Sequence, residues 1–272
     1  IYIALFFGLI LAYVKYIETR GIFFPTREIE FVPALINLSF EDEYIQTKDG
    51  LKINGWFIPH SNAKYTLLFF HGNAGNIGHR LDKIQLLRKA NVNIFISLLH
   101  TVGMNIFIID YRGYGRSQGR PSENGLYLDA QAAYDYLVDN RKIRQDEIIL
   151  YGESLGTAIA IDLASKVNVK ALILEGTFSS GRDMAKKLYP FLPIFLFSHR
   201  FDSLAKIKTV NAAKLFIHSR NDEIVPFELA EKIYNSACEP KQFLEITGGH
   251  NSAFLDSEEK YVSSIISFIE QL

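Results

Sequence analysis

The feature that most constrains this chain is a series of short apolar segments, each followed by a turn and then by a helical pattern. Thr66–Phe70, Asn105–Ile109 and Glu147–Tyr151 are three such segments. Continuous apolar strands that alternate with helices indicate an α/β fold, in which a mostly parallel central sheet carries helices on both faces. Functional groups in such folds gather in the loops beyond the carboxyl ends of the strands.

The remaining elements extend the same pattern toward both ends of the chain. Two strand-like segments flank Asp49-Gly50, a pair that is typical of a hairpin turn. Helices are expected near His79–Lys89, near Gly125–Asp139, and after the GESLG sequence through Lys166. The further strands are expected at Glu43–Thr47, Lys52–Ile58, Ala171–Glu175, Lys214–Ser219 and Gln242–Ile246.

Composition excludes several classes of protein. The 272 residues are 48% hydrophobic and carry a net charge of −1, which suits a globular core and gives no basic surface for nucleic acid. The single cysteine, Cys238, can form neither an internal disulfide nor a thiolate metal cluster. Because no metal-ligand spacing is present either, the sequence predicts a reaction that uses no cofactor and no metal.

Residues 1–20 stand apart from this pattern. Ile1–Val14 is apolar and uncharged, and Tyr2, Tyr13 and Tyr16 suit a membrane interface. The run is shorter than the ~17–25 residues that span a bilayer, so we predict a single-pass membrane anchor that the numbering cuts short, with either membrane face compatible. A buried core helix is the alternative, and a signal peptide lacks its small-residue cleavage site. Asn37-Leu38-Ser39 is a glycosylation sequon, which matters only in a lumen.

One stretch breaks the regular alternation of strands and helices. Residues 86–96 (LLRKANVNIFI) resemble residues 98–108 (LLHTVGMNIFI) with a period of 12. Two such units are too few for a solenoid, so we interpret them as a local duplication. Only one NIFI sequence can occupy the central strand position, and we assign the second because DYRGYG follows it directly.

The pattern G-x-S-x-G occurs twice and offers two candidate nucleophiles. Ser154, in GESLG, follows the strand-like EIILY and precedes the helical TAIAIDLASK. This is the context of a nucleophile elbow, a sharp turn from strand to helix that exposes the serine at the edge of the sheet. Ser117, in GRSQG, lies several residues beyond its strand and precedes Arg120-Pro121, so we interpret it as a loop serine.

An acid and a histidine follow Ser154 in the chain order that this fold requires. Asp222 comes after the predicted strand Lys214–Ser219, and His250 comes after Gln242–Ile246. A serine hydroxyl needs such a base, held in the right tautomer, to act as a nucleophile. Glu223 and Glu175 are alternative acids, because each also lies at or just beyond the end of a strand.

Two other histidines suit structural roles. His218 lies inside an apolar strand and is expected to be a core residue. His71 follows a strand but precedes Ser154, so it does not fit the order of the three groups. We expect its imidazole to brace a loop through a hydrogen bond to the backbone.

Two backbone N–H groups are expected to form an oxyanion hole. One belongs to Leu155, directly after the nucleophile at the positive end of its helix. The second comes from the HGNAGN turn, where Asn73 is preferred and Ala74 is the alternative. A phosphate-binding loop is the competing interpretation of this turn, but it lacks the G-x-G-x-x-G and Walker patterns.

The motifs HGNAGN, DYRGYGRSQGRPSENG, YGESLG, SRNDEIVP and GGHN together resemble the α/β-hydrolase superfamily. More narrowly, they look like its membrane-anchored branch of the α/β hydrolase domain-containing protein 13 type. The resemblance covers about residues 25–272, and the duplication departs from it. It implies an α/β-hydrolase fold, a triad of Ser154, Asp222 and His250, and a single-pass anchor. Relatives of this branch include protein depalmitoylases.

The segment between the strands at Glu175 and Lys214 is strongly apolar and suits a small cap of about residues 177–210 over an acyl pocket. Ordinary helix packing is the alternative. We expect a serine hydrolase of esters or thioesters, with a lipid or protein-palmitoyl thioester as a candidate substrate. A serine peptidase and a noncatalytic binding protein of the same fold are the competing hypotheses. The sequence indicates no oligomeric state.

Overall fold

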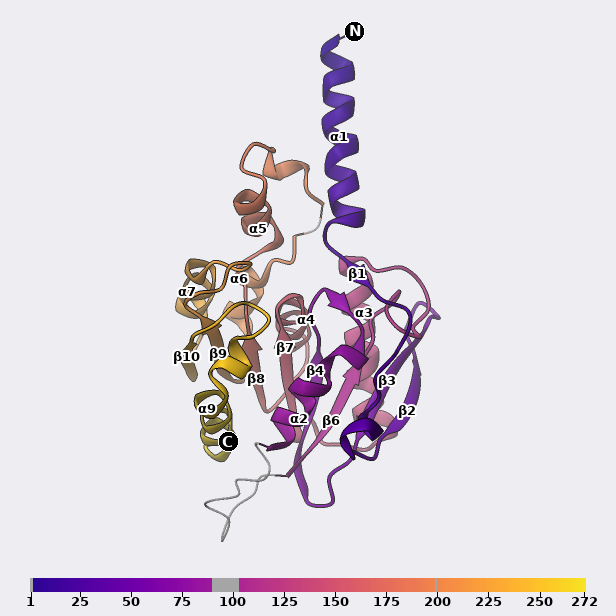
Figure 1. Ribbon diagram of the computed structural model, residues 1–272, viewed down its shortest axis with the longest axis vertical. Coiled ribbons are helices and arrows are strands. Elements are labelled where there is room, and N and C mark those ends of the chain that lie inside the picture. The colour runs from indigo at the N-terminus through magenta and orange to yellow at the C-terminus, as the bar shows by residue number, and fades with distance from the viewer. Residues whose placement is uncertain (1, 90–102, 199) are drawn as a thin grey trace.

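The computed structural model describes residues 2–89, 103–198 and 200–272, and its centre is one eight-stranded sheet (Figure 1). The strand order is β10-β9-β8-β7-β4-β6-β3-β2. Strands β4 and β6 to β10 run parallel, whereas β2 and β3 pair antiparallel at one edge. The strands of this sheet are β2 (Glu41–Gln46), β3 (Lys52–Ile58), β4 (Ala63–Phe70), β6 (Gly103–Ile109), β7 (Ile148–Glu153), β8 (Ala171–Glu175), β9 (Ala213–Ser219) and β10 (Lys241–Ile246).

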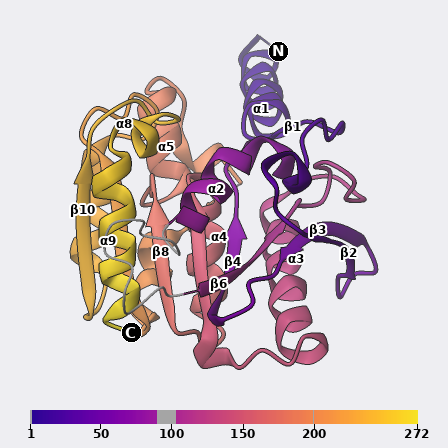
Figure 2. The ribbon, with the colours of Figure 1, turned by 60° about the horizontal axis from the view of Figure 1, so that its bottom comes forward.

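Helices cover both faces of the sheet and enclose two separate apolar layers. One layer lies between the sheet and the helices α3, α4 and α7, and the other between the sheet and α2 and α9. Figure 2 shows α9 alongside β10. The helices are α1 (Tyr2–Arg20), α2 (Leu81–Lys89), α3 (Glu123–Asp135), α4 (Leu155–Ala164), α5 (Gly181–Leu188), α6 (Ser203–Lys206), α7 (Phe227–Ser236), α8 (Ala253–Asp256) and α9 (Glu258–Glu270).

Short elements complete the fold. A two-stranded parallel pair, β1 (Phe24–Pro25) with β5 (Ala74–Gly75), ties the segment after α1 to the loop after β4. The single helical turns are η1 (Pro33–Ile36), η2 (Ile77–Arg80), η3 (Tyr136–Asn140), η4 (Gln145–Glu147), η5 (Ile194–Leu196) and η6 (Ile207–Thr209).

This architecture is the predicted α/β-hydrolase fold, with its mostly parallel sheet and two helical layers. Strands β3 and β8 have the predicted bounds, and the Asp49-Gly50 turn joins β2 to β3 as expected. Strand β6 contains the second NIFI sequence, which confirms its assignment to the sheet. The first NIFI sequence, and with it the comparison of the two duplicated units, lies outside the described residues.

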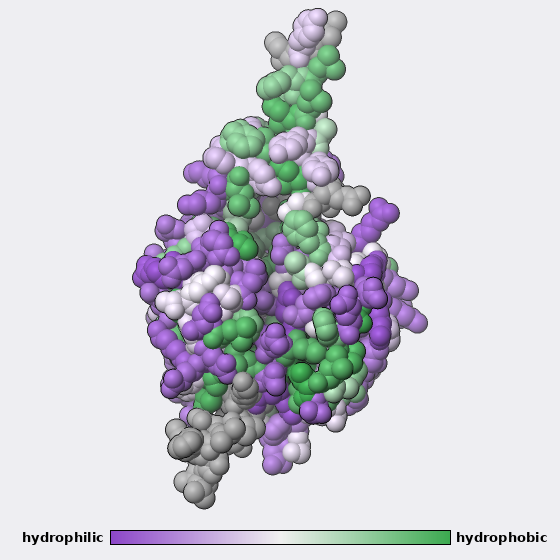
Figure 3. Space-filling model, viewed as in Figure 1, coloured by the Kyte–Doolittle hydropathy of each residue, from purple (hydrophilic) through white to green (hydrophobic). Residues whose placement is uncertain are grey.

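The apolar N-terminal residues form helix α1, which projects from the sheet domain (Figures 1 and 3). The predicted single-pass anchor is not supported, because no helix in the part of the chain described here is both long and apolar enough to cross a membrane. Only the last turns of α1 pack closely: Val14, Ile17 and Glu18 are buried, whereas Phe6 and Leu9 are exposed. The alternative of a buried core helix therefore fits only the C-terminal end of α1.

Residues 177–210, hereafter the cap segment, leave the sheet after β8 and return to it at β9. The segment contains α5, η5, α6 and η6. Figures 1 and 2 place α5 and α1 at the same end of the molecule. Ala185, Leu192 and Phe197 of the cap segment pack against Val14 and Ile17 of α1 in a third apolar cluster.

Candidate active site

Ser154 occupies the sharp turn between β7 and α4, as the sequence predicts for a nucleophile elbow. Its backbone is strained, with φ 52° and ψ −114°, a combination that non-glycine residues rarely adopt. The turn is also crowded, since a Cβ at Gly156 would lie 1.9 Å from the backbone oxygen of Phe70. The N–H of Ser154 donates to the backbone oxygen of Glu175 at 2.8 Å. The glycine and this bond together hold the serine at the end of the sheet.

The structure brings together the three side chains that the sequence predicts. His250 Nε2 lies 3.0 Å from Ser154 Oγ, and His250 Nδ1 lies 2.6 Å from Asp222 Oδ2. Because an ionised carboxylate only accepts hydrogen bonds, the Nδ1 proton points at Asp222 and Nε2 is free to accept from the serine hydroxyl. The second oxygen of Asp222 accepts from the N–H groups of Ile224 (2.9 Å) and Val225 (2.7 Å), which fixes the orientation of the carboxylate.

Neither alternative acid contacts the imidazole ring. Glu223 accepts a hydrogen bond from the backbone N–H of His250 at 2.9 Å and so positions its loop. Glu175 points into the layer under α2 and α9, where Lys83 Nζ donates to both of its carboxylate oxygens at 2.6 and 2.8 Å. The hydroxyls of Tyr151 and Tyr261 also donate to Glu175. Of the three carboxylates, Asp222 is therefore the one whose side chain contacts His250 Nδ1.

The charges around the site favour an ionised Asp222 and raise the proton affinity of His250. Burial alone would lower the pKa of His250, but its hydrogen bond to Asp222 and the charges of Asp222, Glu153 and Glu175 raise it above its ordinary value of 6.5. Burial would raise the pKa of Asp222, whereas the bond and charge of His250 and two backbone N–H groups bring it below its usual range. Each group thus stabilises the charged form of the other.

Leu155 and Asn73 lie beside Ser154, on the wall of the same pocket. Leu155 is the first residue of α4, so its N–H is among those without a partner inside the helix. Asn73 is held by three hydrogen bonds: its side-chain amide donates to the backbone oxygen of Ile22 (3.0 Å), and its own backbone oxygen accepts from the Phe24 N–H (3.0 Å) and the Tyr114 hydroxyl (2.7 Å). The loop that carries Asn73 is therefore fixed next to Ser154.

The other serine and histidine candidates have structural roles. Ser117 is fully buried, and its hydroxyl donates to the backbone oxygen of Asp110 at 2.6 Å and accepts from the Asn54 N–H at 2.8 Å. The bracing role of His71 is confirmed, since its Nδ1 lies 2.7 Å from the backbone oxygen of Gly72. His218 is buried, with Nε2 3.0 Å from the backbone oxygen of Val225, as expected for a core residue.

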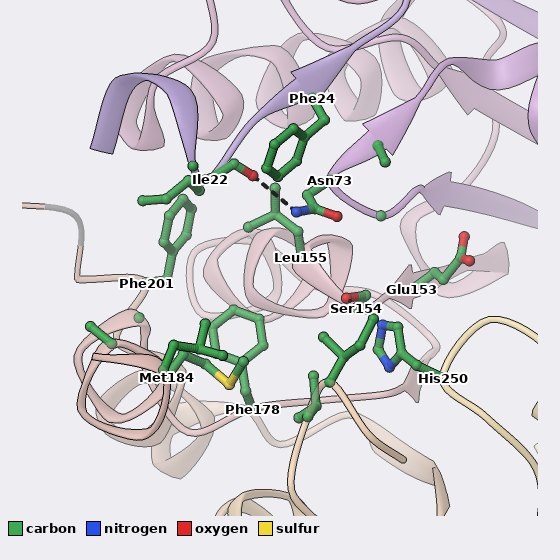
Figure 4. A pocket seen from close by; sticks show the side chains of 18 of the residues that line it. Ile22, Phe24, Asn73, Glu153, Ser154, Leu155, Phe178, Met184, Phe201 and His250 are labelled. Atoms are coloured by element: carbon green, nitrogen blue, oxygen red, sulfur yellow. Dashed lines mark hydrogen bonds between the residues drawn. The ribbon is translucent and has the colours of Figure 1, made fainter. Parts of the chain in front are cut away.

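A cavity of about 440 Å³ opens next to Ser154, within the roughly 300–1,000 Å³ range of small-molecule pockets. Figure 4 shows Ser154 between two kinds of wall. Glu153 and His250 lie on one side of it, and the apolar side chains of Met184, Phe178, Phe201, Ile22 and Phe24 lie on the other. Among the described residues, no group of three His, Cys, Asp or Glu side chains is placed to hold a metal ion.

The sequence did not indicate a charged pair that lines this pocket. Arg80 Nε donates to Glu153 Oε2 at 2.8 Å, and both residues line the cavity. Burial would raise the pKa of Glu153, but Arg80, Lys83 and His71 lower it to about 2. Glu153 is the second residue of the GESLG motif, but nothing in the sequence pairs it with Arg80, 73 positions earlier.

Fold and site together define the class of protein. The family model of the alpha/beta hydrolase fold matches residues 65–196, which run from the strand β4 through the nucleophile elbow into the cap segment. The chain belongs to the α/β-hydrolase family, and this membership supports a hydrolase.

Individual relatives extend the match over most of the chain. It is 34% identical over 269 residues to the alpha/beta hydrolase domain-containing protein WAV2 of Arabidopsis thaliana, covering 90% of this chain and 83% of the relative. It is 37% identical over 214 residues to protein bem46 of Schizosaccharomyces pombe, covering 74% and 67%. Among solved structures, the Pyrococcus furiosus esterase Pf2001 has a TM-score of 0.74 at 21% identity and covers 92% of this chain and 97% of its own, which supports the fold.

Proposed function

We propose that this protein is a serine hydrolase that cleaves a carboxylic ester or thioester through an acyl-enzyme. The observation that carries the proposal is the continuous chain of contacts from Ser154 Oγ through His250 to Asp222. A noncatalytic binding protein has no use for a strained serine aligned with a histidine and a carboxylate. No observation on the described residues favours a peptide substrate, so we propose an ester or thioester.

The proposed reaction has two halves, acylation of Ser154 and hydrolysis of the acyl-serine, and the same groups act in both. His250 Nε2 accepts the proton of Ser154 as the hydroxyl oxygen attacks the substrate carbonyl, and Asp222 stabilises the imidazolium that forms. The N–H groups of Leu155 and Asn73 stabilise the oxyanion of the tetrahedral intermediate. His250 then protonates the leaving alcohol or thiol as the carbonyl re-forms. Water repeats the sequence on the acyl-serine, releases the acid and restores Ser154.

The walls of the cavity support an acyl substrate. The apolar wall, made by the cap segment and the residues around Ile22, suits an acyl group, and a protein-palmitoyl thioester is one such substrate. Affiliation with the α/β hydrolase domain-containing protein 13 type agrees with this substrate class and is part of the proposal. Membrane contact through residues 1–20 stays a prediction.

A fluorophosphonate probe tests the proposal directly, because it phosphonylates an activated serine and loses fluoride. We expect labelling of the parent, no labelling of Ser154→Ala, and retained labelling of Ser117→Ala. Circular dichroism of all three proteins controls for folding, which matters for Ser117→Ala because that hydroxyl makes two buried hydrogen bonds. A folded parent that does not react, or a folded Ser154→Ala that still does, contradicts the proposal.

A further inference from the structure

We infer that helix α1 forms one wall of an acyl-chain site, and that the chain of a long acyl substrate lies between α1 and the cap helix α5. The inference rests on the proposed function, since it takes the acyl group of the cleaved ester as the ligand. It gives the C-terminal end of α1 a role in substrate selection, whatever the exposed N-terminal part of the helix contacts.

Helix α1 and the residues that follow it contribute to the wall of the cavity. Ile17, from the last turns of α1, and Gly21 and Ile22, which follow the helix, contribute to the same cavity as Ser154. Met184 and Ala185 of α5 line it as well. Residues more than 130 positions apart in the sequence therefore line one cavity together with Ser154.

Helix α1 is fixed to the cap segment by packing and by a buried carboxylate. Glu18 is only 3% exposed, and it accepts hydrogen bonds from both the backbone N–H and the hydroxyl of Ser198, the latter at 2.7 Å. Ile17 packs with Ala185 and Phe197 in the third apolar cluster. A carboxylate buried among apolar residues needs such partners, so this contact also fixes where α1 sits along the cap segment.

The direction of the acyl chain follows from the two walls around Ser154. Arg80 and Glu153 form a charged boundary on the side of His250, which delivers a proton to the leaving group. Ile22, Met184 and Phe201 lie on the opposite side (Figure 4). An alkyl chain gains by leaving water only on the apolar side, so it extends away from His250 and toward α1 and α5.

An acyl-chain site leads to a quantitative expectation for how kcat/KM depends on the length of the acyl chain. Each methylene that leaves water contributes up to about a fourfold gain in kcat/KM. We therefore expect the parent to prefer p-nitrophenyl octanoate over p-nitrophenyl acetate by at least about tenfold in kcat/KM. Both esters are used below their aggregation concentrations, and the leaving group is the same in each.

Two bulky substitutions, one on each wall, test the position of the chain. Ile17→Trp on α1 and Met184→Trp on α5 fill the space between the helices, so each is expected to lower kcat/KM for octanoate by about tenfold or more and leave acetate within about twofold. The matched control is Leu11→Trp, which adds the same side chain to an exposed position of α1 outside the cavity. It is expected to leave kcat/KM for both esters unchanged. Glu18→Ala, which releases α1 from Ser198, is expected to weaken the octanoate preference.

The outcomes separate this inference from the proposed function. If the parent hydrolyses acetate through Ser154 but shows no octanoate preference, or if both tryptophan variants keep the parent ratio, the acyl site is wrong and the serine hydrolase stands. If Met184→Trp alone lowers the ratio, the chain follows α5 without α1, which also overturns the inference. If the folded parent cleaves neither ester and no probe labels it, both proposals fall together.

Discussion

The loops that carry Ser154, Asp222 and His250 differ sharply from the layer above them, made of α1 and the cap segment. The loops follow three strands of one sheet, and their side chains are joined by hydrogen bonds of 2.6 and 3.0 Å. In the layer above them, α1 is joined to the cap segment by one small apolar cluster and by the contacts of Glu18 with Ser198. This layer also exposes large apolar side chains, including Phe7, Leu188 and Phe195.

This difference suggests that the two regions have different tasks, the loops in the reaction itself and the upper layer in the choice of substrate. Proton transfer requires the reacting atoms to be positioned to within a few tenths of an ångström. Loops anchored on a sheet that is buried between two helical layers can hold side chains with that precision. Recognition of an alkyl chain needs only apolar walls at roughly the right distance, because the hydrophobic effect has no direction. Changes near the sheet are therefore expected to affect turnover or folding, and changes in the upper layer to affect substrate preference.

The largest expected effect is on turnover, at Asp222→Asn. The asparagine amide cannot hold the Nδ1 proton of His250 toward itself as a carboxylate does, so kcat/KM should fall by about 10⁴-fold. Backbone contacts of the loop stay available, because a side-chain oxygen remains for the N–H groups of Ile224 and Val225. Steady-state ester hydrolysis measures the loss.

Glu223→Gln is the matched control for that change. Glu223 contacts only the backbone N–H of His250 in this site, so a loss of about tenfold or less is expected. Equal losses in the two variants would show that loop placement, and not the acid, dominates the effect.

The next effect is on folding, at Lys83→Met. Lys83 is 2% exposed and pairs with Glu175 at 2.6 Å below the elbow. Its removal leaves a buried carboxylate without its cation, so the free energy of unfolding should fall by about 3–5 kcal/mol in urea titrations. Lys15→Met removes an exposed cation on α1, which lies 3.9 Å from the buried carboxylate of Glu18, and should cost less than about 1 kcal/mol. Similar losses in both would contradict the comparison.

A smaller effect is expected in the pH dependence of kcat/KM. His250 accepts a proton only when neutral, so activity rises with pH through its pKa, which lies above 6.5. Glu153→Gln removes one of the charges that raise this pKa, and the midpoint should move to lower pH. Glu245→Gln, which removes an exposed partner of Arg220, serves as the control and should leave the midpoint unchanged. A midpoint that rises in Glu153→Gln would be inconsistent with the charges described.

The smallest effect is expected at Leu11→Ala on the exposed face of α1. Leu11 is half exposed and does not line the cavity. The free energy of unfolding should change by less than about 0.5 kcal/mol, and the ratio of octanoate to acetate turnover should be that of the parent. A changed ratio would mean that the exposed face of α1 also contacts substrate.

The sequence predicted the sheet and the strand-to-helix turn at Ser154 well, because both depend on local signals. A buried parallel strand requires a continuous apolar run, and a nucleophile elbow requires small residues around the serine, as in Gly152 and Gly156. The role of Glu175, one of the two alternative acids, was harder to predict from the sequence. It lies on the same face of β8 as Ala171 and Ile173, toward Lys83 of α2, so the alternation of side chains along a strand could have directed it away from His250.

The sequence by itself determined the order of strands along the chain, the turn that exposes Ser154, and the positions of Asp222 and His250 after their strands, since each is written in neighbouring residues. Only the tertiary structure decided which acid meets His250, that Arg80 pairs with Glu153, and that α1 packs on the cap segment. The physical reason is range. Strand and turn preferences act over a few residues, whereas these contacts join side chains that approach one another only after the sheet has formed.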